Sequence, residues 1–296
     1  MLVTVMGATG KTGKAATDRL LAEGIKVRAL GRSMEKLAPL AKAGAQPVVA
    51  DANKAAELTA AFRGADAVYA LVPPYLSAPD LLAYYERVNG AIASAIVESN
   101  VRRVVYLSSL GAELDAGTGP VRGLHAGEQM LKAIPGLDLL FMRPGFFYEN
   151  HFGSLGLIKS QGINGGATAP DVPITTLAAS DIGEAVASAL AKRDFSGIIV
   201  RELCGPRDLT MAEATRILGS KIGKPDLGYV QFPDDGFIAG LESAGFSHSM
   251  ATLFAEMSHA FNARKVKPHQ PRTPANTGTT TFESFAEIFA QAYQAA

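Results

Sequence analysis

The sequence predicts an α/β protein, a doubly wound parallel Rossmann sheet with a smaller C-terminal substrate lobe. A short apolar run at the N-terminus ends in three glycines spaced Gly-x-x-Gly-x-x-Gly. Near-continuous apolar runs of strand length then alternate with helical patterns up to about residue 150, which is typical of a parallel sheet covered on both faces. A chain of 296 residues is long enough for one large α/β domain and a smaller lobe.

The first predicted element is a strand over residues 2–6, which leads into the glycine turn and a helical pattern from Lys14 to Glu23. Gly7 allows the tight turn, Gly10 lets a ligand approach the backbone, and Gly13 lets the helix pack closely on the strand. Free N–H groups at the start of a helix can hold a pyrophosphate. This context favours a dinucleotide site over the alternative, a glycine turn that serves packing alone.

The second strand, Ile25–Leu30, ends without the carboxylate that binds the ribose hydroxyls in NAD-binding versions of this layout. Arg32 and Ser33 follow it instead, and Lys36 lies on the next helix. A planar guanidinium pairs well with a phosphate dianion. We therefore expect the cofactor to be NADP (NADPH) rather than NAD. The alternative for Arg32 is a solvated surface side chain.

The remaining strands of the sheet follow in order along the first half of the chain. They are predicted at residues 46–50, 66–72, 103–108 and 137–142, and the intervening helices near 53–62, 79–99 and 121–133. Right-handed crossovers between such elements give a doubly wound sheet.

After Asn150 the pattern changes. We expect residues 1–150 to form the NAD(P)-binding Rossmann domain and residues 151–296 the substrate-binding lobe, with some of its elements returning to the main sheet. Glycine-rich segments come first, followed by a helix opened by Ser180. Strands are then predicted at 197–203 and 228–232, and helices at 211–222, 234–244, 247–262 and 282–293.

Composition bounds the class of protein. Basic and acidic residues both total 28, so no net charge recruits nucleic acid or an anionic membrane. The single cysteine, Cys204, excludes an internal disulfide and suits a buried small side chain better than a reactive thiol. Neither a signal-peptide pattern nor a membrane-length apolar stretch is present. We expect a cytoplasmic protein without a metal site.

Several motifs together resemble the NmrA-like group of atypical short-chain dehydrogenases/reductases. They are residues 7–13, residues 31–33, Val72-Pro73-Pro74, residues 143–150 and residues 280–286. The similarity spans almost the whole chain. It is specific for the group but not for one activity, because the group holds NADPH-dependent reductases of quinones, dyes and aromatic compounds. It also holds proteins that bind NADP and sense redox state without turnover.

The resemblance implies cofactor contacts along the carboxyl ends of the strands. Val72 and Pro73 would lie beside the ribose and nicotinamide, and the backbone of residues 144–147 would fix the carboxamide. Asp51 would lie near the adenine or serve as a helix N-cap, and Ser108 would contact the cofactor or cap local structure. The predicted cofactor residues are Gly7, Thr9, Gly10, Lys11, Thr12, Gly13, Arg32, Ser33, Lys36, Asp51, Val72, Pro73, Ser108, Pro144, Gly145 and Phe146.

The chain departs from the wider group at the catalytic motif, a Tyr with a Lys four residues later. None of the eight tyrosines has Lys at that position, and alignment on Glu128 places Pro120 and Leu124 where the pair would be. Ketone reduction through that proton relay is therefore not expected. His125 could donate a proton instead, oriented by Glu128 on the same helical face. The alternative for His125 is a structural histidine.

Tyr148 is the second residue that we predict to be catalytic, and Tyr75 and His151 are further polar candidates near the mouth of the site. Aromatic side chains could form an apolar slot for a flat substrate, although core packing is the more common role for any one of them. These aromatic residues are Phe146, Phe147, Tyr148, Phe152, Phe232 and Phe237.

The leading hypothesis is an NADPH-dependent reductase that transfers hydride to a quinone-like or other conjugated small molecule, with His125 or water as proton source. Such an acceptor needs little acid–base help. The rival hypothesis is a non-catalytic NADP(H)-sensing regulator that acts through another protein. An isomerase or dehydratase that retains its cofactor fits the fold, but no specific residue favours it. The expected partner is a small aromatic molecule, without nucleic acid or membrane, and the chain could form a homodimer.

Overall fold

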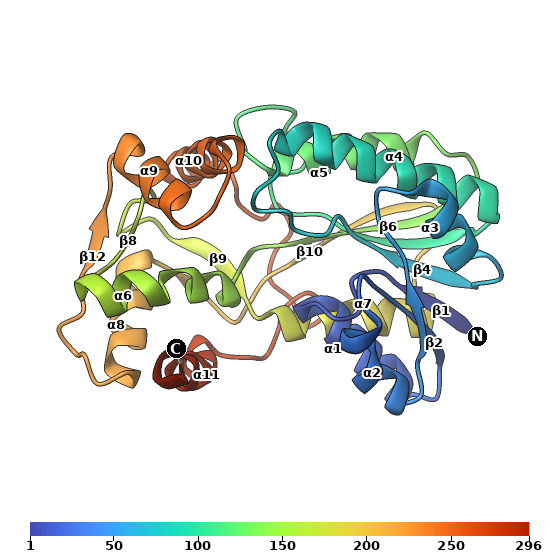
Figure 1. The fold of residues 1–296 in the computed structure, drawn as a ribbon, viewed down its shortest axis with the longest axis horizontal. Helices are drawn as coiled ribbons and strands as arrows, with labels where there is room; N and C mark the ends of the chain where they lie inside the picture. The colour runs from blue at the N-terminus through green and yellow to red at the C-terminus, as the bar shows by residue number, and fades with distance from the viewer. Residues whose placement is uncertain (296) are drawn as a thin grey trace.

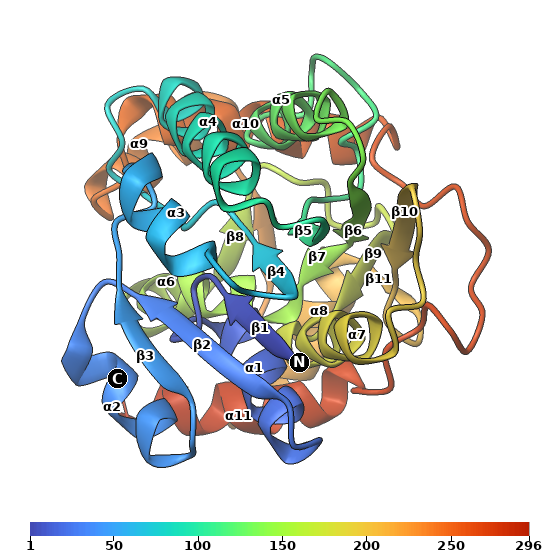
Figure 2. The same ribbon diagram turned by 90° about the vertical axis from the view of Figure 1, so that its right-hand side faces the viewer.

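A parallel seven-stranded sheet forms the centre of the structure, a computed structural model that describes residues 1–295. The strand order is β10-β6-β5-β4-β1-β2-β3, so the chain begins near the middle and winds outwards in both directions (Figure 1 and Figure 2). The doubly wound sheet predicted from the sequence is confirmed. Its strands are β1 (Leu2–Val5), β2 (Lys26–Gly31), β3 (Gln46–Val49), β4 (Ala67–Ala70), β5 (Arg103–Leu107), β6 (Asp138–Pro144) and β10 (Ile198–Leu203).

Helices cover both faces of this sheet (Figure 1). Val3, Val68 and Val104 are fully buried in the centre of the sheet, which explains why the central strands β1, β4 and β5 are mostly apolar. One face carries α1 (Lys11–Ala22), α2 (Met34–Lys42) and α7 (Ala179–Lys192), and the other carries α3 (Ala55–Phe62), α4 (Leu81–Ser99) and α5 (Val121–Lys132).

Two elements from the second half of the chain return to the main sheet. Strand β10 pairs in parallel with β6, with Val200 opposite Phe141. Helix α7 packs closely on α1 because Gly183 has no side chain: a Cβ there would lie 2.4 Å from that of Ala15. The Rossmann unit therefore draws on residues beyond position 150.

The smaller lobe lies beyond the carboxyl ends of the strands (Figure 1). Where the sequence indicated only glycine-rich segments, a 3₁₀ helix (Tyr148–Ser154), α6 and β8 form. The strands of this lobe are β7 (Phe146–Phe147), β8 (Asn164–Gly166), β9 (Ile174–Leu177), β11 (Asp208–Leu209) and β12 (Tyr229–Gln231). Its helices are α6 (Leu155–Gln161), α8 (Met211–Lys221), α9 (Asp234–Ser243), α10 (His248–Asn262) and α11 (Phe282–Ala295).

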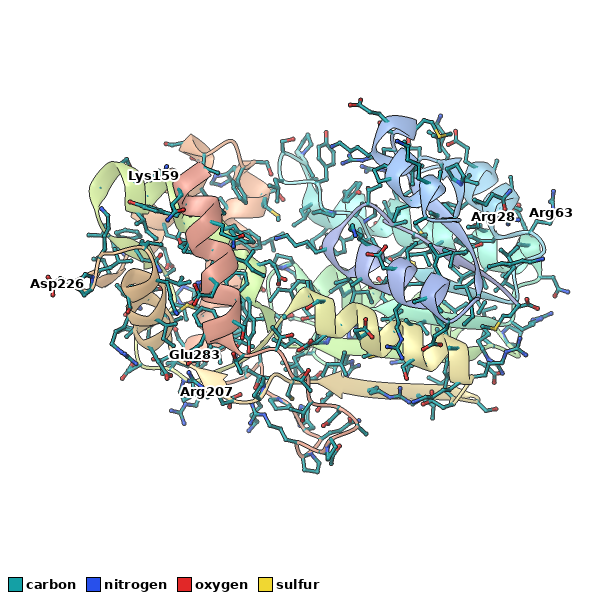
Figure 3. The ribbon with its side chains drawn as sticks, turned by 90° about the horizontal axis from the view of Figure 1, so that it is seen from below. Arg28, Arg63, Lys159, Arg207, Asp226 and Glu283 are labelled. Carbon is teal, nitrogen blue, oxygen red and sulfur yellow. The ribbon has the colours of Figure 1, made fainter. Side chains whose placement is uncertain are left out.

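Helix α11 closes the core of the smaller lobe. Phe282, Phe285 and Phe289 point inward from it, and the rings of Phe282 and Tyr148 meet edge to face at 5.1 Å. Outside this core, Arg207 donates to Glu283 at 2.6 Å and also pairs with Glu213 of α8. In Figure 3 the labelled Arg207 lies next to Glu283, at the lower end of α11.

Cys204 is buried, as the sequence predicts, and burial raises the pKa of its thiol. In the described part of the chain, residues 1–295, no group of three or more His, Cys, Asp or Glu side chains could hold a metal ion. None of the helices within these residues combines the length and the apolar character needed to span a bilayer.

Candidate cofactor and substrate site

The turn between β1 and α1 is built so that no side chain fills it. Gly7 has a φ of +60°, a left-handed conformation that favours glycine. The Gly10 amide donates to the Gly7 carbonyl at 2.8 Å. A Cβ on Gly13 would lie 2.2 Å from that same oxygen, so only glycine lets α1 pack this closely. The first amides of α1 lack intrahelical acceptors, and the turn therefore fits a pyrophosphate.

Two side chains at the start of α1 are already engaged with the protein. The buried Thr12 hydroxyl accepts a hydrogen bond from Tyr69 of β4 at 3.0 Å. The Lys11 ammonium donates to the Glu149 carbonyl at 3.3 Å and lies over the Phe152 ring, and its burial lowers the pKa of Lys11. Of the residues predicted in this turn, Thr12 would therefore contact a pyrophosphate through its backbone amide rather than its hydroxyl. Lys11 connects the turn to the smaller lobe.

A basic surface follows β2. Arg32 is exposed, and the Ser33 hydroxyl caps α2 by accepting from the Lys36 amide at 3.4 Å. Asp51, after β3, accepts from the Asn53 amide at 2.9 Å. This hydrogen bond, together with the nearby charges that include Arg32, lowers the pKa of Asp51.

Asp51 is not the N-cap that we considered for it. Lys54 precedes the first residue of α3 in the N-cap position, and Asp51 instead closes a turn through Asn53. Its proximity to an adenine stays a prediction.

The carboxyl ends of β4 and β6 lie at the same edge of the sheet as the glycine turn, with β4 next to β1 and β6 two strands beyond β4. Val72 and Pro73 are half-buried there, and the Pro73 carbonyl accepts from Tyr84 of α4 at 2.9 Å. These positions agree with a cofactor laid across the strand ends, and contact with a ribose stays a prediction.

Some backbone groups at the end of β6 already have protein partners. The Pro144 carbonyl accepts from the Leu110 amide, and the Gly145 amide donates to the Leu203 carbonyl, both at 3.0 Å. Phe146 is paired with Thr176 of β9. A contact between the backbone of residues 144–147 and a carboxamide stays a prediction.

Ser108 serves the protein rather than a ligand. Its hydroxyl donates to Glu128 at 2.7 Å, and Arg143 donates to both oxygens of the same carboxylate, at 2.8 and 2.6 Å. Glu128 is fully buried. This contact favours the structural role that we considered for Ser108. It also corrects the prediction that Glu128 orients His125.

His125 does not point to the substrate cavity. Its Nδ1 lies 2.9 Å from the Ala112 carbonyl, so the ring is fixed on the loop that precedes α5. The ring is absent from the residues that line the cavity described below. The structural alternative for His125 therefore fits the geometry better than the proton-donor role.

Tyr148 is also misplaced for catalysis. It is 1% exposed and packs in the aromatic core of the smaller lobe, where burial raises the pKa of its hydroxyl to about 12. That hydroxyl lies 3.4 Å from the Thr280 carbonyl. Tyr75 is exposed and packs edge-on against Tyr84. The sequence placed Tyr148 near the mouth because it could not distinguish a core from a cleft, whereas the position of Tyr75 near the mouth stays a prediction.

His151 is a buried, neutral histidine. Its ring lies edge-on between Phe146 and Phe282, at 5.8 and 5.2 Å. Burial lowers the pKa of His151 to about 4, so the imidazole carries no charge near neutral pH.

A cavity of about 230 Å³ lies next to the residues that follow β6. Phe146 and Phe147 line it, as predicted. Phe232 and Phe237 instead pack against Gly165 and Gly166, and Phe152 stacks on Phe289. The complete lining is Tyr85, Ser109, Leu110, Pro120, Val121, Pro144, Gly145, Phe146, Phe147, Asn150, Ile174, Thr175, Met250, Phe254, Met257, Phe261 and Val266.

Helix α10 provides the opposite wall, which the sequence analysis missed. Met250, Phe254, Met257 and Phe261 all line the cavity. Their spacing of four, three and four residues places them on one face of a helix, and this was the signal in the sequence. Helix α10 passes so close to Gly119 that a Cβ there would lie 2.0 Å from the α10 backbone.

Comparisons with known proteins agree with this geometry. The profile of the NAD(P)H-binding family matches residues 7–193. The NmrA-like family domain-containing oxidoreductase ptmS of Penicillium ochrochloron is 33% identical over 161 residues, which are 50% of this chain and 48% of that protein. The chain thus spans about half the length of this relative. The match confirms the resemblance to the NmrA-like group.

Two solved structures share the fold over nearly their whole length. The NADPH-dependent quinone oxidoreductase QOR2 of Escherichia coli, complexed with NADPH, has a TM-score of 0.81 and 22% identity, covering 97% of this chain and 99% of that chain. The triphenylmethane reductase of Citrobacter sp. has a TM-score of 0.81 and 18% identity, covering 99% of this chain and 100% of that chain.

Proposed function

The chain belongs to the NAD(P)H-binding family, and from this premise we propose that it is an NADPH-dependent reductase of a quinone-like or other conjugated small molecule. The observation that carries the proposal is the cavity beside Phe146 and Phe147, which has the size and apolar walls suited to a flat aromatic compound. Of the two enzymes whose folds it shares, one is a quinone oxidoreductase and the other a triphenylmethane reductase, and both are named for conjugated acceptors.

The proposed reaction is the transfer of one hydride to the acceptor. NADPH, when bound, would supply the hydride with its two electrons and would leave as NADP⁺. The conjugated acceptor becomes a delocalised anion that takes one proton from water. Because that anion is already stable, the chain needs to position the acceptor more than it needs to provide an acid. Neither His125 nor Tyr148 takes part in this proposal.

The choice of NADPH over NADH rests on the surface that follows β2. Arg32 is exposed there, and Lys36 is exposed on the first turns of α2. The segment between β2 and α2, residues 32–33, contains no carboxylate that would bind ribose hydroxyls and repel a 2′-phosphate. Arg32 would therefore hold the additional phosphate, while the first amides of α1 hold the pyrophosphate.

The test is an assay of NADPH consumption, followed by the loss of NADPH absorbance, with a panel of quinones, azo dyes and enones. Cofactor affinity is measured in parallel by calorimetry. We expect tight NADPH binding together with turnover on at least one quinone. Tight binding without turnover on any acceptor would refute the reductase and favour the NADP(H)-sensing regulator.

A further inference from the structure

The cavity is uncharged throughout. Within the described residues 1–295, its lining includes no Asp, Glu, Lys, Arg or His side chain. Nine of the lining residues are Phe, Met, Val or Ile: Phe146, Phe147, Phe254, Phe261, Met250, Met257, Val121, Val266 and Ile174. A charged group placed in such surroundings loses its hydration and finds no opposite charge.

The polar groups of the lining are neutral as well. The Thr175 hydroxyl donates to Asp208 at 2.8 Å and the Ser109 hydroxyl to the Leu110 carbonyl at 3.0 Å. Tyr85 and Asn150 provide the other side-chain donors of the lining. Burial raises the pKa of Tyr85 to about 12, so its hydroxyl stays protonated near neutral pH. Tyr85 and Asn150 are therefore the neutral donors of the lining that suit a carbonyl oxygen rather than an ion.

An ion pair joins helices α5 and α10 next to the cavity lining. Arg122 follows the lining residue Val121 on α5, and Glu256 precedes the lining residue Met257 on α10. The Arg122 guanidinium lies 3.6 Å from the Glu256 carboxylate. This pair bridges the two helices, so neither charge is left to attract an ion of opposite sign.

We propose that the cavity selects uncharged hydride acceptors and excludes both anionic and cationic acceptors. The selected acceptors are neutral quinones, which have carbonyl oxygens and a compact ring system. This inference rests on the proposed reductase function and restricts its substrate class. Hydride transfer to such an acceptor balances as NADPH + quinone + H⁺ giving NADP⁺ + hydroquinone. The proton reaches a hydroquinone oxygen from water.

The test uses three naphthoquinones with one shared ring system: menadione, a naphthoquinone sulfonate and a trimethylammonium-substituted naphthoquinone. Their affinities are measured by calorimetry on protein loaded with tetrahydro-NADPH, a redox-inactive analogue, and kcat/KM is measured with NADPH. We expect menadione to bind roughly 100-fold more tightly than either charged compound, since an unpaired charge in an apolar site costs a few kcal/mol.

A charge introduced at Met257 should change this selection in a predictable direction. Met257 is half-buried, and Met257→Lys should strengthen binding of the sulfonate about tenfold or more, whereas Met257→Glu should do so for the ammonium compound. The same pair of substitutions at Thr252, which is exposed on α10, is the matched control and should leave the affinity ratios within about threefold. If the Met257 variants do not fold, the pair is made at Val266, a half-buried loop residue of the lining.

The outcomes separate this inference from the proposed function. A charged naphthoquinone that binds within tenfold of menadione would overturn the selection of neutral acceptors, and so would Met257 charges without effect on the ratios. If no naphthoquinone is bound or reduced while an azo dye or enone turns over, the selection of neutral quinones is overturned and the reductase function stands. If NADPH binds but no acceptor of the whole panel turns over, the reductase function itself is refuted.

Discussion

Arg143 and Glu128 form a bidentate ion pair that is almost completely shielded from water. Arg143 Nε donates to one carboxylate oxygen at 2.8 Å and Nη2 to the other at 2.6 Å, and the two side chains are 8% and 0% exposed. The pair joins α5 to the last residues of β6, directly before Pro144 of the cavity wall. Two parallel hydrogen bonds of this kind fix the relative orientation of the two side chains and also stabilise their contact.

Removing one partner of this pair should be more harmful than removing both. Arg143→Met leaves the Glu128 carboxylate buried without its partner, and we expect it to lower the free energy of unfolding by ~3–5 kcal/mol. The double variant Glu128→Leu with Arg143→Met should recover much of that loss. Urea unfolding of the two variants measures the difference, and equal stability of the single and double variants would contradict it.

Gly13 should not tolerate even one additional methyl group. In Gly13→Ala the Cβ would lie 2.2 Å from the Gly7 carbonyl, so α1 must shift and the pyrophosphate turn with it. We expect a loss of ~2–4 kcal/mol in stability and a clear loss of NADPH affinity. Gly90→Ala, in the open middle of α4, is the matched control and should stabilise the protein by ~0.5–1 kcal/mol. Unfolding curves and NADPH titrations of both variants test these two expectations.

Arg32→Asp should separate the two nicotinamide cofactors. It places a carboxylate where we expect the 2′-phosphate, and we expect NADPH affinity to fall about 100-fold, with a much smaller change for NADH. Arg63→Asp is the control, since Arg63 is exposed after α3 at the far end of the molecule from α11 (Figure 3). Fluorescence titration with both cofactors measures the effect, and equal losses for NADPH and NADH would show that Arg32 is not the selector.

Neither His125 nor Tyr148 should be needed for turnover. His125→Phe removes the contact with the Ala112 carbonyl, and Tyr148→Phe removes a weak one with the Thr280 carbonyl. Each should cost ~1 kcal/mol of stability or less and leave kcat within about threefold of wild type. A tenfold or greater drop in kcat of either folded variant would return that residue to the proton-donor role.

His151 should make the protein less stable at acidic pH. Its pKa is about 4 in the folded protein, against 6.5 for an unperturbed histidine. The unfolded chain therefore binds the additional proton first, and stability falls as the pH drops from 6.5 towards 4. At pH 5 this contribution is ~2 kcal/mol relative to pH 7. The difference between the unfolding free energies at pH 5 and pH 7 should be ~2 kcal/mol smaller in His151→Phe than in the wild type. An unchanged difference would contradict the lowered pKa of His151.

Much of the Rossmann half could be predicted because its signals are local. The spacing of Gly7, Gly10 and Gly13 follows from contacts within a single turn, and apolar runs flanked by helical patterns identify a buried parallel sheet. The basic residues after β2 could likewise be named, because a strand end fixes where its next side chains lie.

The roles of individual side chains in the site required the folded structure. Ser108, His125 and Tyr148 all stand at positions that a pattern can assign to a cleft, and all three hydrogen-bond to protein groups instead. The cavity wall comes from α10, more than a hundred residues beyond Phe147 along the chain. By itself the sequence determined the fold and the nucleotide turn, because these depend on short-range periodicity and backbone freedom. Tertiary packing alone decided which aromatic rings surround a ligand and which surround one another, because burial arises between segments whose approach no local pattern encodes.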